Sequence, residues 1–210
     1  MRKEEFLGEY NQGADTDEIF RQLEQAGYQY LGGGQDATVW GRDQGEVLKV
    51  LMPSHIKETA EKSFMIFHDA CQAMKGNPHV PRFIDQASVF EINGVDYMQI
   101  SMERLEPIEE GSDNQLIVWA LSDLCTNTNW DNVAVQLEDP EFWSSVPDIT
   151  LERIESLLYH IDLEDCRALF DTMQSFYQIA QQNDLGWDLH TENVMQRANG
   201  TLVITDPFYN

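Results

Sequence analysis

Apolar positions repeat at helical spacing over residues 15–27, where Ile19, Phe20 and Leu23 share one face. Such a stripe predicts an amphipathic helix that buries this face. Gly27 ends the pattern, as glycine commonly does directly after a helix. The periodic part of the chain therefore begins with a short helix, after which the repeat changes.

Beyond this helix, short runs of β-prone residues alternate with glycine and turn residues. The runs predict five strands, at residues 28–31, 37–40, 47–52, 83–92 and 95–102. Asn93-Gly94 separates the last two and is a strong signal for a two-residue hairpin turn. One helical pattern, residues 54–74, interrupts the series. We therefore expect a five-stranded antiparallel sheet with one inserted helix.

After residue 105 the pattern becomes mainly helical. Helices are predicted at residues 116–125, 150–159 and 164–182, and short strands at 193–196 and 201–204. The helix at 164–182 carries apolar residues at spacings of three and four along its whole length. The pattern predicts an α+β fold. We divide it into a helical extension at 1–26, a β lobe with its following linker at 27–105, and a minimal helical lobe at 106–210.

Charge narrows the class of protein. The 210 residues include 37 acidic and 13 basic side chains, for a formal net charge of −24. This argues against direct binding to nucleic acid or to anionic membranes, because phosphate neutralisation requires clustered Lys and Arg. The three cysteines, Cys71, Cys125 and Cys166, match neither a disulfide framework nor a zinc site. With no apolar leader and no long apolar run, we expect a cytoplasmic protein.

A glycine-rich turn between the first two predicted strands is the first candidate site. Gly32, Gly33 and Gly34 precede Ala37 and Val39 in the pattern G-x-G-x-x-A-x-V. Glycine lets backbone amides approach phosphate oxygens without a Cβ in the way, and Val39 offers an apolar cover for a flat ring. The same triplet also fits an ordinary hairpin turn.

Lys49 is the only charged residue in the apolar run 47–52. An unpaired buried ammonium is costly, so this side chain needs either water or an anion. In one interpretation Lys49 holds phosphates, and in the other it faces solvent from an edge strand. The helix at 54–74 offers Glu61, or less readily Glu58, as an ion-pair partner.

The most specific set of polar residues lies near the C-terminus. Asp188, His190 and Asn193 share one loop after the clearest helix, and Asp206 closes a later strand. Carboxylate and amide oxygens, completed by water and substrate phosphates, are ligands that suit Mg²⁺. Each residue alone is a common turn or cap residue, but the ordered set is hard to obtain by chance.

Taken together, these motifs resemble those of the protein-kinase-like superfamily. The glycine turn is similar to G-x-G-x-x-G-x-V, and Lys49 is similar to the strand lysine of V-A-I-K. Asp188 and Asn193 match D-x-x-x-x-N, and residues 206–208 (Asp-Pro-Phe) take the place of D-F-G. His190 is typical of aminoglycoside phosphotransferases. The layout of residues 27–208 most resembles the small early-gene Ser/Thr kinases of lytic bacteriophages.

The resemblance implies a bilobal kinase-like fold with a truncated helical lobe, and ATP with Mg²⁺ or Mn²⁺ as cofactors. It implies nucleotide contacts at Gly32, Gly33, Gly34, Ala37, Val39, Lys49, Glu61, Met102, Glu103 and Leu105. Residues 102–105 resemble the hinge that reads the adenine edge. The implied catalytic residues are Asp188 at the acceptor hydroxyl, Lys49 at the α- and β-phosphates, and His190 at the γ-phosphate, with Asn193 and Asp206 holding the metal.

The sequence also departs from the kinase pattern. Gly186-Trp187 stands where His-Arg usually precedes the catalytic Asp, and no activation segment follows Asp206. We therefore expect the acidic region 103–165 or another chain to hold the substrate.

Three functions remain open. The first is a minimal phage-type Ser/Thr protein kinase that acts on host proteins, including partners with a basic surface, in the host cytoplasm. The second is a weak or inactive kinase-like protein that binds and inhibits a partner through its acidic surface. The third is a small-molecule kinase, which His190 suggests.

Overall fold

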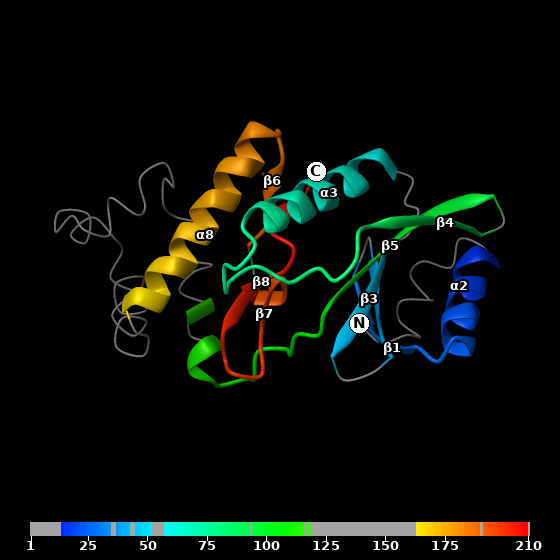
Figure 1. Ribbon diagram of the computed structural model, residues 1–210, viewed down its shortest axis with the longest axis horizontal. Coiled ribbons are helices and arrows are strands. Elements are labelled where there is room, and N and C mark those ends of the chain that lie inside the picture. The colour runs from blue at the N-terminus through cyan, green and yellow to red at the C-terminus, as the bar shows by residue number, and fades with distance from the viewer. Residues whose placement is uncertain are drawn as a thin grey trace. The chain divides into compact units, whose positions relative to one another are not determined.

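A computed structural model describes residues 14–34, 37–42, 45–51, 57–92, 94–115, 117–118, 163–189 and 191–209 (Figure 1). The predicted helix at 150–159 lies outside these residues. Of the predicted helix at 116–125, residues 117 and 118 are described, and both are helical.

The sequence prediction of a five-stranded antiparallel sheet with one inserted helix is confirmed. The strands are β1 (Gln29–Gly33), β2 (Ala37–Gly41), β3 (Glu46–Leu51), β4 (Ser88–Ile92) and β5 (Val95–Glu103). They lie in the order β1-β2-β3-β5-β4, and every neighbouring pair is antiparallel. Helix α3 (Lys57–Ala73) is inserted between β3 and β4. Together with the helices this makes the fold α+β, as expected.

One predicted strand is shorter than expected. The run 83–92 is a strand only from Ser88, and Phe83 forms an isolated bridge to Met102. Residues 84–87 include Asp85 and Ala87, residue types that are depleted in strands, so the apolar ends of the run do not join into one strand.

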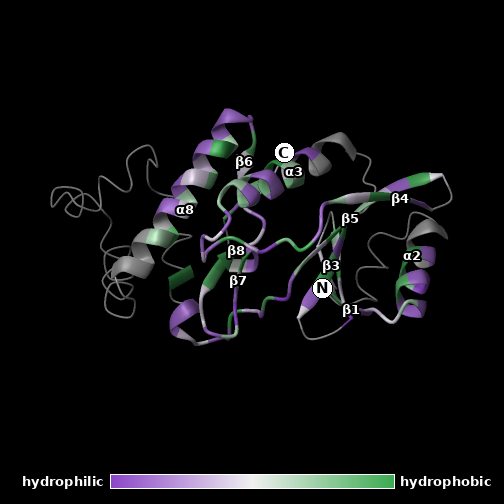
Figure 2. Ribbon diagram, in the orientation of Figure 1, coloured by the Kyte–Doolittle hydropathy of each residue, from purple (hydrophilic) through white to green (hydrophobic). Residues whose placement is uncertain are grey.

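Helix α2 (Ala14–Gln25) covers one face of the sheet. Its Phe20 packs with Trp40, Leu48 and Val50, all of them buried. The rings of Phe20 and Trp40 meet edge to face with their centroids 4.8 Å apart, a favoured aromatic geometry. Hydrophobic and hydrophilic residues alternate along α2, as the amphipathic pattern predicts (Figure 2).

The C-terminal part of the chain contains helix α8 (Leu163–Gln182) and two small two-stranded sheets. Strand β6 (Gly186–Trp187) pairs with β9 (Phe208–Tyr209), and β7 (Val194–Gln196) pairs with β8 (Leu202–Ile204). The 3-10 turn η2 (Thr191–Asn193) precedes β7. The sequence predicted α8, β7 and β8. It missed β6 and β9, because a strand of two residues carries no recognisable alternation.

By its internal contacts the chain divides into two compact units. The first, called the sheet unit below, contains residues 1–62 and 82–104, and the second, called the α8 unit, contains residues 63–81 and 105–210. The domain boundaries predicted at 26 and 105 stay predictions. Within the described residues, no helix is both long enough and apolar enough to span a bilayer.

Candidate functional site

Asp188 leads out of the short strand β6, and its position is set by backbone pairing. Gly186 pairs with Tyr209 and Trp187 with Phe208. Directly after this pairing, the amide of Asp188 donates a hydrogen bond of 2.8 Å to the carbonyl of Pro207. Asp188 is therefore tied to the residue that follows Asp206 in the chain.

Asn193 completes the connection from the other side. Its Nδ2 donates to the Asp188 carbonyl at 2.7 Å and to Asp188 Oδ2 at 3.3 Å. The Asn193 carbonyl in turn accepts a bond of 2.9 Å from the amide of Thr205. Asp206 thus lies between Thr205, whose amide is hydrogen-bonded to Asn193, and Pro207, whose carbonyl is hydrogen-bonded to Asp188. The structure brings together three of the polar residues that the sequence singled out.

The donor atoms of this loop fit a hard divalent cation. Because Nδ2 of Asn193 is directed to Asp188, Oδ1 is the atom of that amide with ligand chemistry. The carboxylate of Asp206 is half-buried and supplies a second kind of oxygen. Mg²⁺ is commonly bound by one or two protein oxygens together with water and substrate phosphates. Asn193 and Asp206 therefore offer oxygen atoms of the kind that Mg²⁺ binds, and their role as metal ligands stays a prediction.

Aromatic packing holds the strand that follows Asp206. Phe208 is buried, and its ring meets the rings of Phe67 and Phe176 edge to face at 6.1 and 5.8 Å. Trp187 packs edge to face on Tyr177 at 5.9 Å. Trp187 occupies the position where the kinase pattern carries Arg, and here that position serves packing.

The Tyr209 ring covers Gly186 and would have to move for a side chain to fit there. A Cβ at this residue would overlap the ring of Tyr209 on the paired strand β9. The kinase pattern carries His at this position. The structure gives a steric reason for the departure, because the Tyr209 ring covers the space that the histidine would need.

In the sheet unit, Lys49 lies in a row of residues on one sheet face. Val39 is directly opposite Lys49 on β2, and Ile100 is directly opposite it on β5. Directly opposed residues share a face, and neighbours along a strand alternate between faces. The row therefore lies on the face opposite Leu48 and Val50, which pack against α2.

Met102 lies on the same face as Lys49. It pairs with Val47, which is two residues from Lys49 on β3. Lys49 is half-buried, whereas Ile100 and Met102 are buried. Lys49, Val39 and Met102, predicted from sequence as nucleotide contacts, thus share one apolar face with a single ammonium group.

The glycine turn is tighter than its sequence suggests. A Cβ at Gly33 would lie 2.9 Å from the Ala37 carbonyl and 3.0 Å from the Tyr30 hydroxyl, whereas Gly32 and Gly34 have open space around them. The Gly34 amide donates to the Ala37 carbonyl at 2.9 Å. The Gly34 amide therefore closes the turn, and the nucleotide contacts expected at Gly32, Gly33, Gly34 and Ala37 stay predictions.

Glu103 is bound within its own unit. Its buried carboxylate accepts bonds from the backbone amide, Nε and NH2 of Arg82 at 2.8, 2.9 and 2.7 Å. Its backbone amide donates to the Arg82 carbonyl at 2.9 Å. While these bonds persist, neither the amide nor the carboxylate of Glu103 can form hydrogen bonds with the edge of an adenine ring. Sequence reasoning missed Arg82, because no local signal pairs residues that are twenty-one positions apart.

Three further predicted residues are placed less fully. Leu105 is buried and is the first residue of the α8 unit after the sheet. Glu61 belongs to helix α3, but its side chain lies outside the described part, so its pairing with Lys49 stays a prediction. His190 also lies outside the described residues.

The chain was compared with known proteins. No family model and no curated protein sequence matches it. Among solved structures, it is similar to a ternary complex of streptomycin, ATP and APH(2″)-IIa, with 14% identity, a TM-score of 0.37, and coverage of 94% of this chain and 73% of that one. It is also similar to the ADP-bound aminoglycoside phosphotransferase APH(2″)-Ib, with 16% identity, a TM-score of 0.36, and coverage of 92% and 72%.

Proposed function

We propose that this protein is an ATP-dependent phosphotransferase of kinase-like fold, and specifically a minimal Ser/Thr protein kinase acting on host proteins. The observation that carries the proposal is the loop from Asp188 to Asn193, called the Asp188 loop below. There, Asn193 is hydrogen-bonded to Asp188, and the two residues that flank Asp206 are bonded to Asn193 and Asp188. Phosphoryl transfer depends mostly on positioning and on neutralising charge, and this loop supplies both kinds of group.

Each residue of the loop has a role in the proposed reaction. Asp188 accepts or orients the proton of the acceptor hydroxyl, and Asn193 Nδ2 holds its carboxylate in place. Asn193 Oδ1 and Asp206 would hold Mg²⁺, which when bound neutralises charge on the phosphate oxygens. Because hydrogen bonds and aromatic packing already fix the loop, the groups need little rearrangement.

Lys49 is the proposed phosphate ligand of the sheet unit. It lies in a row with Val39 and Ile100, and its ammonium group is a cation that attracts phosphate oxygens. The proposal assigns the open turn at Gly32 to the same phosphates and Val39 to the cover of the adenine ring.

The proposal is tested with γ-labelled ATP and Mg²⁺, using as acceptors the protein itself, a basic protein, a bacterial lysate and streptomycin. Asp188→Ala and Asp206→Ala should each lower transfer about 100-fold or more. Asp171→Ala is the matched control, because Asp171 is an exposed aspartate on α8 within the same unit. Transfer to protein that survives in both site variants would contradict the proposal.

A second function is favoured by one observation, the net charge of −24. A surface of that charge suits the binding and inhibition of a basic partner protein without transfer. In that case partner capture would be unchanged in Asp188→Ala, and no acceptor would be labelled. Label on streptomycin alone would instead identify a small-molecule kinase.

A further inference from the structure

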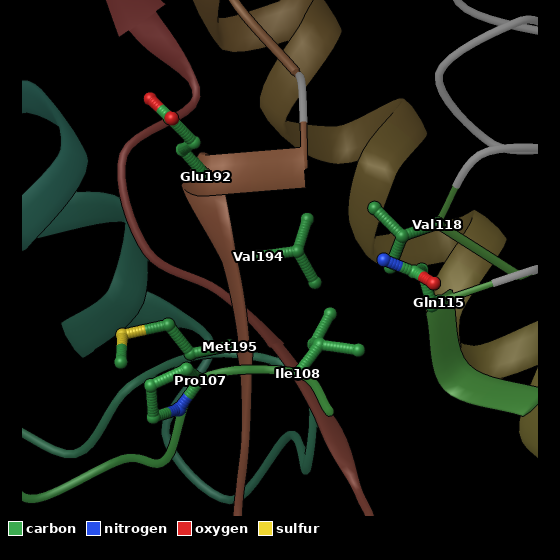
Figure 3. Close-up of a pocket in the computed structure, with 7 residues that line it drawn as sticks. All are labelled: Pro107, Ile108, Gln115, Val118, Glu192, Val194 and Met195. Carbon is green, nitrogen blue, oxygen red and sulfur yellow. The ribbon is translucent and has the colours of Figure 1, made fainter. Parts of the chain in front are cut away.

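A pocket of about 240 Å³ opens in the α8 unit beside the Asp188 loop (Figure 3). Its lining is mostly apolar and includes Pro107, Ile108, Val118, Val194 and Met195. In Figure 3 the side chains of Ile108, Val118 and Val194 point toward one another.

Two residues supply the polar part of the lining. These are Gln115 and Glu192. The pocket therefore combines an apolar interior with one carboxylate at its exposed edge, which in Figure 3 points away from Ile108, Val118 and Val194.

Hydrogen bonds within the chain hold the walls of the pocket. Glu106 and Gln196 exchange two backbone bonds of 2.8 and 2.9 Å, which hold the segment before Pro107 against β7. Asn114 Nδ2 donates to Gln196 Oε1 at 2.6 Å, and the Gly111 amide donates to Gln115 Oε1 at 2.7 Å. A pocket formed in this way costs little ordering entropy when an occupant binds.

The pocket adjoins the proposed acceptor site. Glu192 and Val194 are the chain neighbours of Asn193, about 3.8 Å away along the backbone. Asn193 is bonded to Asp188, the group proposed to meet the acceptor hydroxyl. The rest of a molecule with one side chain in the pocket can therefore reach the Asp188 loop.

The lining and its rim indicate the chemistry of that occupant. Apolar walls favour an aliphatic side chain, because its binding removes apolar surface from water. The rim segment 106–113 contains four exposed acidic residues and no Lys or Arg, and Glu192 adds a fifth carboxylate. This charge favours a cation next to the aliphatic group. An aminosugar would match the charge, but those of its hydroxyl groups that met the apolar walls would lose their hydrogen bonds to water.

We infer that this pocket selects the protein acceptor by binding an aliphatic side chain that lies next to a lysine or arginine. The inference rests on the proposed function and names its substrate class.

Direct binding tests this without requiring turnover. A set of fluorescein-labelled peptides is made, each with one Ser, two Arg and one Leu, and the position of the Leu relative to the Ser differs from peptide to peptide. Each peptide is titrated with the full chain in the presence of a non-hydrolysable ATP analogue. The best peptide should lose about tenfold in affinity when Leu becomes Ser, and about fivefold when both Arg become Gln. Equal affinity of all the peptides would overturn the inference.

Two variants assign the effect to the pocket. Ile108→Trp fills it and should abolish the preference for Leu, whereas Glu192→Gln should weaken the preference for Arg. The matched controls are Val89→Trp and Glu91→Gln, at exposed positions on strand β4 of the sheet unit, and both should keep the wild-type preferences. Circular dichroism checks that each variant is folded, and a milder Ile108→Phe replaces Ile108→Trp if that variant is not.

The outcomes separate this inference from the proposed function. If no acceptor is ever labelled, the proposed function fails, while the peptide titration still decides the inference. If Ile108→Trp weakens the affinity for the ATP analogue and leaves peptide affinity unchanged, the pocket binds nucleotide and the inference is wrong. Displacement of the peptide by streptomycin from the wild type but not from Ile108→Trp would also overturn it.

Discussion

At the scale of single residues, Gly186 is constrained by the Tyr209 ring that covers it. Gly186→Ala should destabilise the protein by about 1 kcal/mol, at the low end for overpacking, because Tyr209 is 54% exposed and its ring can move outward. The free energy of unfolding in urea measures this loss. Gly186→Ala combined with Tyr209→Ala should cost no more than Tyr209→Ala alone, and an additive loss would contradict the steric explanation.

At the same scale, the sequence predicted the chemical groups of the site better than their contacts. Asp188, Asn193 and Asp206 were predicted from their order and spacing, and the structure brings them together. The bonds of Arg82 to Glu103 were not predicted, since their partners meet only after the chain has folded back. Because of that pairing, the amide and the carboxylate of Glu103 are hydrogen-bonded to Arg82 and do not bind a ligand while those bonds persist.

At the scale of elements, helix α2 is part of the sheet unit, because Ile19 and Phe20 are buried against the sheet. Phe20→Ala should destabilise the protein by about 3–5 kcal/mol, the usual cost of removing a buried aromatic ring. Urea unfolding followed by tryptophan fluorescence measures it. Arg21→Ala is the neighbouring control and should change the midpoint little, because Arg21 is exposed. Equal effects of the two variants would mean that α2 does not stabilise the sheet.

Elements with a clear repeat were predicted almost to the residue. The expected helix at 164–182 is α8 (Leu163–Gln182), and the expected strand at 95–102 is β5 (Val95–Glu103). Both are long enough for periodicity to show. Strands β6 and β9 have two residues each and exist through their mutual pairing, which local sequence does not encode.

At the scale of the whole molecule, the net charge of −24 opposes compaction. Raising NaCl from about 10 mM to about 300 mM should therefore raise the melting temperature, because salt screens the repulsion between exposed carboxylates. Differential scanning calorimetry measures the shift, with sucrose of equal osmolality as the control for non-ionic effects. A melting temperature that falls with NaCl would show that attractive ion pairs outweigh the repulsion.

The sequence by itself determined the class of the sheet, the main helices and the order of the polar groups, because periodicity and residue chemistry are local properties. Only the tertiary structure decided which atoms of those groups are hydrogen-bonded within the chain and which face a ligand. The Pro207 carbonyl and the Thr205 amide secure the position of Asp206, and Asn193 turns its Nδ2 toward Asp188. Such bonds join segments that meet only after folding, so their geometry is a property of the folded chain.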